Sequence, residues 1–105
     1  MAKPHLIELK GDLGLRDAGE LAAKFREAIE KHAAVAVATG NLGSADLSTV
    51  QLLVAAQKSA ARAGKSFTLV APVGEALQAT LVKAGFLAAD GRPRDAGEQF
   101  WTPGN

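Results

Sequence analysis

The side chains most able to take part in chemistry lie in one short segment, Asp46-Leu47-Ser48-Thr49-Val50. Ser48 stands three residues before Gln51, the spacing of a capping box, in which the serine oxygen accepts the Gln51 backbone N–H. Free amides at a helix N-terminus also stabilise an anion, and a phosphoserine carries about −1.5 to −2 charges. Phosphorylation of Ser48 would therefore spare the fold and change the surface. A structural cap and a phosphorylation switch both stay open.

Other sets of reactive side chains fall short of a catalytic or metal site. His5 and His32 have no metal-ligand spacing to another histidine or a carboxylate, so we expect no metal. No serine has a nucleophile-elbow sequence or a base that the sequence positions. Gly64-Lys65-Ser66 imitates the end of a phosphate-binding loop, but it leaves a helix rather than entering one. The chain has no cysteine, and we expect no catalytic residue and no cofactor.

A glycine-containing segment, Gly40-Asn41-Leu42-Gly43-Ser44, follows an expected strand and precedes an expected helix. This is the place where many α/β proteins bind a ligand. The segment matches neither the dinucleotide-binding nor the P-loop fingerprint. A small-ligand-binding α/β domain remains an alternative.

Length and composition limit the class of protein. The 105 residues suffice for one domain, with its core at about 5–87 and a C-terminal extension at 88–105. The 12 Lys and Arg against 11 Asp and Glu give a net charge of +1, which argues against nucleic-acid binding. No apolar run approaches the ~20 residues that span a bilayer, and the N-terminus lacks a secretory signal. We expect a cytoplasmic protein without membrane insertion, either a monomer or a weak dimer.

Hydrophobic patterning predicts the order strand, helix, strand, helix, strand, helix. Right-handed crossovers between parallel strands then predict an α/β fold, a small mixed β-sheet with parallel β-α-β crossovers packed against helices. The expected strands lie at about 6–9, 33–38 and 67–71, the helices at about 17–32, 48–63 and 75–84, and two of the loops at 11–15 and 39–46.

Side-chain spacing also predicts which faces are buried. Ile7 and Leu9 share one pleat face of the first strand, and Leu77 and Leu81 face inward from the third helix. Asp17 is expected to open the first helix in an acidic version of the capping box.

From Ile7 to Phe86 the layout resembles a STAS domain, the family of anti-sigma factor antagonists. The typical junction of that family is a buried strand, a short loop, and then Asp-Ser-Ser-Gly-Leu before an apolar helix. Here Asp46-Leu47-Ser48-Thr49-Val50 occupies that place. Lys10-Gly11-Asp12-Leu13 after the first strand is also similar to the family. The stretch from Gln51 to Lys65 most resembles small stand-alone members found with bacterial chemosensory systems.

This resemblance implies a non-catalytic domain that binds a partner, a regulatory protein such as an anti-sigma or histidine-kinase-like protein. Ser48 matches the serine that partner kinases phosphorylate, and Thr49, where the family usually has glycine, becomes a second possible phosphoacceptor. Ala38 replaces a frequent aspartate at the strand end. We expect the partner to contact Leu42, Ser44, Asp46, Leu47, Ser48, Thr49 and Val50.

The alternative within the same family is a constitutive STAS module of a transporter or chemosensory complex, never phosphorylated. An enzyme is the weakest alternative, because no acid–base pair can be assembled from the sequence.

Overall fold

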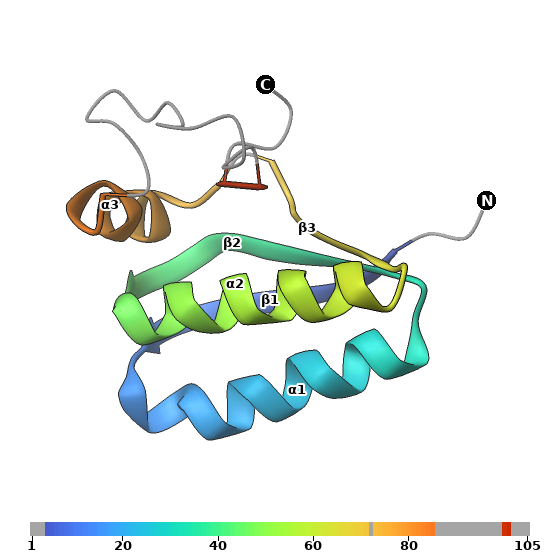
Figure 1. Cartoon of the computed structure of the whole chain (residues 1–105). Coiled ribbons are helices and arrows are strands. Elements are labelled where there is room, and N and C mark those ends of the chain that lie inside the picture. The colour runs from blue at the N-terminus through green and yellow to red at the C-terminus, as the bar shows by residue number, and fades with distance from the viewer. Residues whose placement is uncertain (1–3, 72, 86–99, 102–105) are drawn as a thin grey trace.

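The structure is a computed structural model that describes residues 4–71, 73–85 and 100–101 (Figure 1). The described strands form one sheet in the order β1-β2-β3, and both pairings are parallel. The α/β class with parallel β-α-β crossovers is thereby confirmed. The elements are β1 (His5–Leu13), η1 (Leu15–Asp17), α1 (Ala18–Lys31), β2 (Ala34–Ala45), α2 (Leu47–Arg62), β3 (Ser66–Leu69) and α3 (Glu75–Lys83).

Helices α1 and α2 lie side by side against the sheet (Figure 1). Each has an apolar stripe at helical spacing, because residues three and four apart share a face. The buried side chains of β1 include Ile7 and Leu9, as their shared pleat face predicts. The core between the two layers contains Ile7, Leu9, Phe25, Ile29, Val35, Val37, Val50, Leu53, Phe67 and Leu69.

Small side chains let α2 approach the sheet closely. Ala56 and Ala60 are 6% and 0% exposed on the inner face of the helix. Interiors pack at the density of organic crystals, so a core rich in alanine is thin but still close-packed. The chain therefore forms a layered core from few large apolar residues.

Strands β1 and β2 continue beyond their expected ends. The loops predicted at 11–15 and 39–46 are wrong, since β1 runs to Leu13 and β2 to Ala45, and the two pair along this extension. The ladder is irregular there, with shifts of register after Glu8 and after Gly11. Glycine, asparagine and serine favour turns locally, but a neighbouring strand that satisfies the backbone N–H and C=O groups overrides that preference.

The entry to α1 also differs from the expectation. Asp17 ends the short η1 turn, and its carboxylate accepts the backbone N–H of Gly14 at 3.0 Å. Asp17 stands at the N-cap of α1, as predicted, but it makes no side-chain hydrogen bond to the first turn of that helix, so the predicted capping box is wrong. The η1 turn already holds Asp17 in a helical conformation, from which its side chain reaches back along the chain.

Helix α3 is fixed against the middle of β2 by a buried contact. The Gly74 backbone N–H donates to the Thr39 hydroxyl oxygen at 2.9 Å, and Thr39 is 1% exposed. A Cβ at Gly74 would lie 2.1 Å from the Thr39 carbonyl oxygen, so only glycine fits. Leu77 and Leu81 are both fully buried, which confirms the predicted inner face of this helix.

An aromatic cluster adds residues near the end of the chain to the core. Phe25 and Phe67 meet edge to face at 5.4 Å between ring centroids, and Phe100 stacks on Phe67 at 6.1 Å. Trp101 contacts Phe100 edge to face at 4.8 Å and is only 3% exposed. Trp101 is thus a core residue, although it lies in the segment 88–105 that the sequence places outside the core. Apart from Phe100 and Trp101, the residues of that segment lie outside the described ranges.

Candidate functional site

The first turn of α2 is organised by Asp46. This residue is extended, and its carboxylate accepts the backbone N–H of Ser48 at 3.0 Å and of Thr49 at 3.3 Å. The Ser48 hydroxyl donates to the same carboxylate oxygen. Because the first amides of a helix have no partner within the helix, a side chain that accepts two of them stabilises the start of the helix.

The predicted capping box of Ser48 and Gln51 is therefore wrong. Asp46 is the N-cap, and Ser48 is the second residue of the helix, with its hydroxyl turned back to Asp46 rather than forward to Gln51. A charged carboxylate is a stronger acceptor than a hydroxyl, so the acid two residues earlier takes the capping position.

The hydrogen bonds to Asp46 also set its protonation. The hydroxyl of Ser48 is the largest cause that holds the pKa of Asp46 below its usual value, against a smaller opposing effect of desolvation. Backbone N–H groups of Thr49, Ser48 and Leu15 lower the pKa further. The contact with Leu15 ties the η1 turn to the start of α2.

Burial divides the expected partner-contacting residues into two groups. Leu42, Thr49 and Val50 are 7%, 1% and 0% exposed, so they support the surface from beneath and are not available to a partner. Their expected contact role is corrected accordingly, and Thr49 is not accessible as a phosphoacceptor. The residues that reach the surface are Ser44, Asp46 and Leu47, which are exposed, and Ser48, which is half-buried.

Two exposed leucines flank this carboxylate. Leu15 is 77% exposed and Leu47 is 48% exposed. Leu47 follows Asp46 in the chain, and the backbone N–H of Leu15 bonds to the Asp46 carboxylate. Single exposed apolar residues are common on protein surfaces, but two beside one polar group form a small apolar patch. Leu15 is an apolar residue in a segment expected to be a loop, and the meaning of that local signal depends on the fold. We name Leu15, Ser44, Asp46, Leu47 and Ser48 the switch face.

Acidic groups border the switch face. Asp12 accepts the Ser44 hydroxyl at 3.0 Å, from the strand beside it. Asp12, Ser44 and Arg16 line one shallow hollow together with Leu15. A partner that covers this face would therefore meet two leucines among carboxylates, with Arg16 as the nearby cation.

The segment expected to bind a ligand in the alternative interpretation borders an open hollow of about 630 Å³ at the start of α3. Among the described residues that line it, Glu75 is the one ionisable residue, so this part of the lining offers no cation to a phosphate or carboxylate. The other lining residues are Gly40, Leu42, Gly43, Val73, Gly74 and Ala76.

The resemblance of Gly64-Lys65-Ser66 to a phosphate-binding loop has a structural explanation. Gly64 has a φ of +72°, the left-handed conformation with which many helices end. The Lys65 ammonium donates to the backbone carbonyl oxygens of Ile29 and Glu30, at the end of α1. Cations are favoured at helix C-termini, so this lysine joins two elements of the fold.

The fold also brings the two histidines together. The rings of His5 and His32 stack with centroids 4.1 Å apart and planes 3° from parallel. They lie 27 positions apart in the chain, and spacing along the sequence could not reveal the contact. Within the described residues, no group of three or more His, Asp or Glu is arranged to hold a metal ion.

A family model described as "Mlab, STAS domain" matches residues 2–88. The chain belongs to the STAS domain family. This confirms the resemblance carried by Asp46–Val50 and the elements around it. No curated protein matches the chain in a sequence search. Membership indicates a regulatory or protein-interaction module, and STAS domains are generally non-catalytic. None of the helices in the described part of this STAS domain has the length and apolar character needed to span a bilayer.

Proposed function

We propose that this STAS domain is a non-catalytic, cytoplasmic regulatory module that binds a partner protein through the switch face, and that phosphorylation of Ser48 weakens the binding. The partner is a bacterial regulatory protein, such as an anti-sigma or histidine-kinase-like protein. The observation that carries the proposal is the position of Ser48: its hydroxyl bonds to Asp46 between the two exposed leucines.

The local chemistry explains why a phosphate would act as a switch. The Ser48 hydroxyl donates its proton to the Asp46 carboxylate, and a phosphate ester has no proton to donate there. Two like charges would instead lie side by side, and the backbone amides nearest to them are already bonded to Asp46. Phosphorylation would therefore break the local hydrogen bond and place charge in an apolar contact surface.

The apolar patch explains why the unmodified form would bind. Leu15 and Leu47 are the large apolar side chains of the switch face, and burying each against a partner removes apolar area from water. Interface energy usually concentrates in a few such central residues. The carboxylates of Asp12 and Asp46 favour a partner with basic residues around an apolar pocket.

The test begins with affinity capture of the partner from the native organism and mapping of phosphorylation sites on the recovered domain. Calorimetry then compares the purified partner with the wild type, Leu47→Ala and Ser48→Asp. We expect Leu47→Ala to weaken binding by about tenfold or more and Ser48→Asp to weaken it at least as much. The matched control is Leu6→Ala, since Leu6 is 59% exposed on β1 and lies outside the switch face.

The outcomes separate the proposal from its alternative. If Leu47→Ala weakens binding but Ser48→Asp and Ser48→Ala bind like the wild type, the domain is a constitutive module and the switch is rejected. If Leu6→Ala weakens binding as much as Leu47→Ala, the switch face is not the binding surface.

A further inference from the structure

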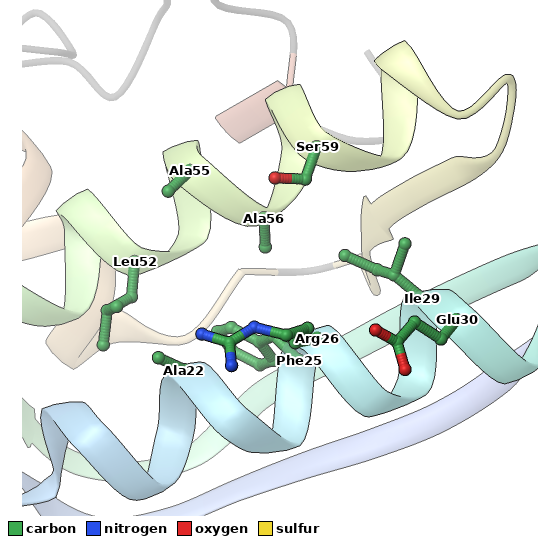
Figure 2. Close-up of a pocket in the computed structure, with 9 residues that line it drawn as sticks. All are labelled: Ala22, Phe25, Arg26, Ile29, Glu30, Leu52, Ala55, Ala56 and Ser59. Atoms are coloured by element: carbon green, nitrogen blue, oxygen red, sulfur yellow. The ribbon is translucent and has the colours of Figure 1, made fainter.

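A groove between α1 and α2 lies outside the switch face. It has a volume of about 300 Å³, and its lining residues come from the facing sides of the two helices (Figure 2). Phe25 and Ile29 form its apolar floor and are 2% and 8% exposed. The α2 side carries Leu52 together with small residues, among them Ala55 and Ser59.

The α1 side of the groove carries one cation and one anion. Arg26 and Glu30 are both exposed and stand four positions apart, about 6 Å along the helix axis. Figure 2 shows the Arg26 guanidinium extending toward Leu52 and the Glu30 carboxylate near the Ile29 end. Neither side chain forms an ion pair within the described residues, whereas the neighbouring Lys31 pairs with Glu27 at 2.7 Å.

This charge order is complementary to itself under a twofold rotation. If a second α1 packs antiparallel across the groove, Arg26 of one protomer faces Glu30 of the other, and the reverse pair forms by symmetry. A twofold interface requires such self-complementarity, because the same patch serves both subunits. A small anionic ligand would gain from Arg26 but be repelled by Glu30, so the pair favours a partner that carries both signs in the opposite order.

We propose that the α1/α2 groove binds a second copy of this chain in a twofold dimer held by two reciprocal Arg26–Glu30 ion pairs. Alanine at the rim lets two helices approach closely, so that the charged side chains of α1 can meet those of the second copy. Phe25 and Ile29 are already buried, so the contact removes little further apolar area from water, and exposed ion pairs contribute little each. The dimer is therefore weak and dissociates on dilution. The proposal is independent of the switch face, which uses other residues.

Sedimentation equilibrium from about 10 µM to about 1 mM protein tests the dimer, a range suited to weak association. The variants are Arg26→Glu, Glu30→Arg and the double exchange of both. Each single change places like charges across the twofold axis, so we expect association to weaken by about tenfold or more. The double exchange restores opposite charges and should return association to within about threefold of the wild type.

The controls separate the contact from general charge effects and from misfolding. Lys24→Glu makes the same change of charge as Arg26→Glu at an exposed position of α1 that does not line the groove, and it should leave association unchanged. Thermal melting of each variant confirms that it is folded. A wild-type monomer at the highest concentration overturns the proposal. A folded double variant that stays monomeric also overturns the proposal. That result would be expected if the groove instead binds a different protein.

Discussion

The two halves of β2 have different neighbours. Over Ala34–Val37 the strand pairs with β1 on one side and β3 on the other, and Val35 and Val37 are 1% and 0% exposed. Over residues 40–45 it pairs with β1 alone among the described strands, because β3 ends at Leu69, and four of these six residues are exposed. One strand thus provides both the centre of the core and the base of the switch face.

The difference predicts where substitutions should change the stability of the domain and where they should not. The first half is flanked by strands on both sides, so its substitutions act on the free energy of unfolding. The second half has no second strand beside it within the described residues and carries polar side chains, so its substitutions should change the free energy of unfolding less. Thr39 lies between the halves and anchors α3. Four substitutions test this division, and we take them from the largest expected effect to the smallest.

We expect the largest loss of stability from Gly74→Ala, at the join of the two halves. The added Cβ would lie 2.1 Å from the Thr39 carbonyl oxygen and 2.8 Å from its carbon, and these backbone atoms cannot move aside alone. The free energy of unfolding should fall by about 3 kcal/mol or more, measured by urea denaturation. The matched control is Gly40→Ala, whose Cβ would meet no heavy atom within 4 Å. An equal loss in both variants would refute the role of this contact.

Val35→Ala should cause the next largest loss of stability, and it tests the buried half of β2. The substitution removes two methyl groups from a side chain that is 1% exposed, which should cost about 2 kcal/mol in urea denaturation. Ser44→Ala, in the exposed half, should change stability by no more than about 0.5 kcal/mol. Comparable losses from the two variants would mean that the halves do not differ in the way described.

Asp46 directly follows the exposed half of β2, and its ionisation should make the stability of the fold depend on pH in the acid range. Replacing it with alanine removes the cap of α2 and should lower the melting temperature at neutral pH by roughly 4–8 °C. Because hydrogen bonding lowers the pKa of Asp46 in the folded state, ionised Asp46 stabilises the folded protein at pH values above 3.8, the ordinary pKa of the group. This stabilisation is lost as the pH falls through the lowered pKa.

The pH dependence is measured by melting the wild type and Asp46→Asn between pH ~7 and ~2. Asparagine is also a good N-cap, so the two proteins should differ little in slope near neutrality. The wild type should lose stability more steeply below pH ~4, because the asparagine has no proton to take up. Parallel curves throughout the acid range would show that Asp46 makes no such contribution.

The smallest effect is expected from Asn41→Ala in the exposed half of β2. The Asn41 amide donates to the Glu8 carboxylate at 2.9 Å, and both side chains are exposed to solvent. Water can replace such a bond, so the melting temperature should change by less than about 3 °C. A larger drop would indicate that the extended β1–β2 ladder contributes to the core rather than only to the surface.

The sequence predicts the buried layers of this fold well and its extended ladder poorly. Ile7 and Leu9, or Leu77 and Leu81, follow the period of a strand or a helix, so their burial can be read locally. The second half of β2 contains glycine, asparagine and serine, which indicate a loop unless the position of β1 is known. Strand pairing between distant segments is a property of the fold, and no local pattern encodes it.

The sequence predicts that Ser48 lies at the start of a helix, but it does not predict which group its hydroxyl bonds to. Family resemblance brought attention to Ser48, but its hydroxyl bonds to Asp46 because a carboxylate two residues earlier can reach the same amides. Leu15 was missed, since its place beside Asp46 depends on a contact between η1 and α2. The Thr39–Gly74 contact spans 35 positions of the chain and leaves no local signal.

The aromatic cluster makes the protein a convenient spectroscopic system. Trp101 is the one tryptophan in the sequence and there is no tyrosine, so near-ultraviolet fluorescence comes almost entirely from a single indole. That indole is 3% exposed and packs through Phe100 toward Phe67 and Phe25. Its emission should shift to longer wavelength when the contact with the core opens. One unlabelled residue can therefore report whether the end of the chain stays docked while the helices remain folded, which far-ultraviolet dichroism measures separately.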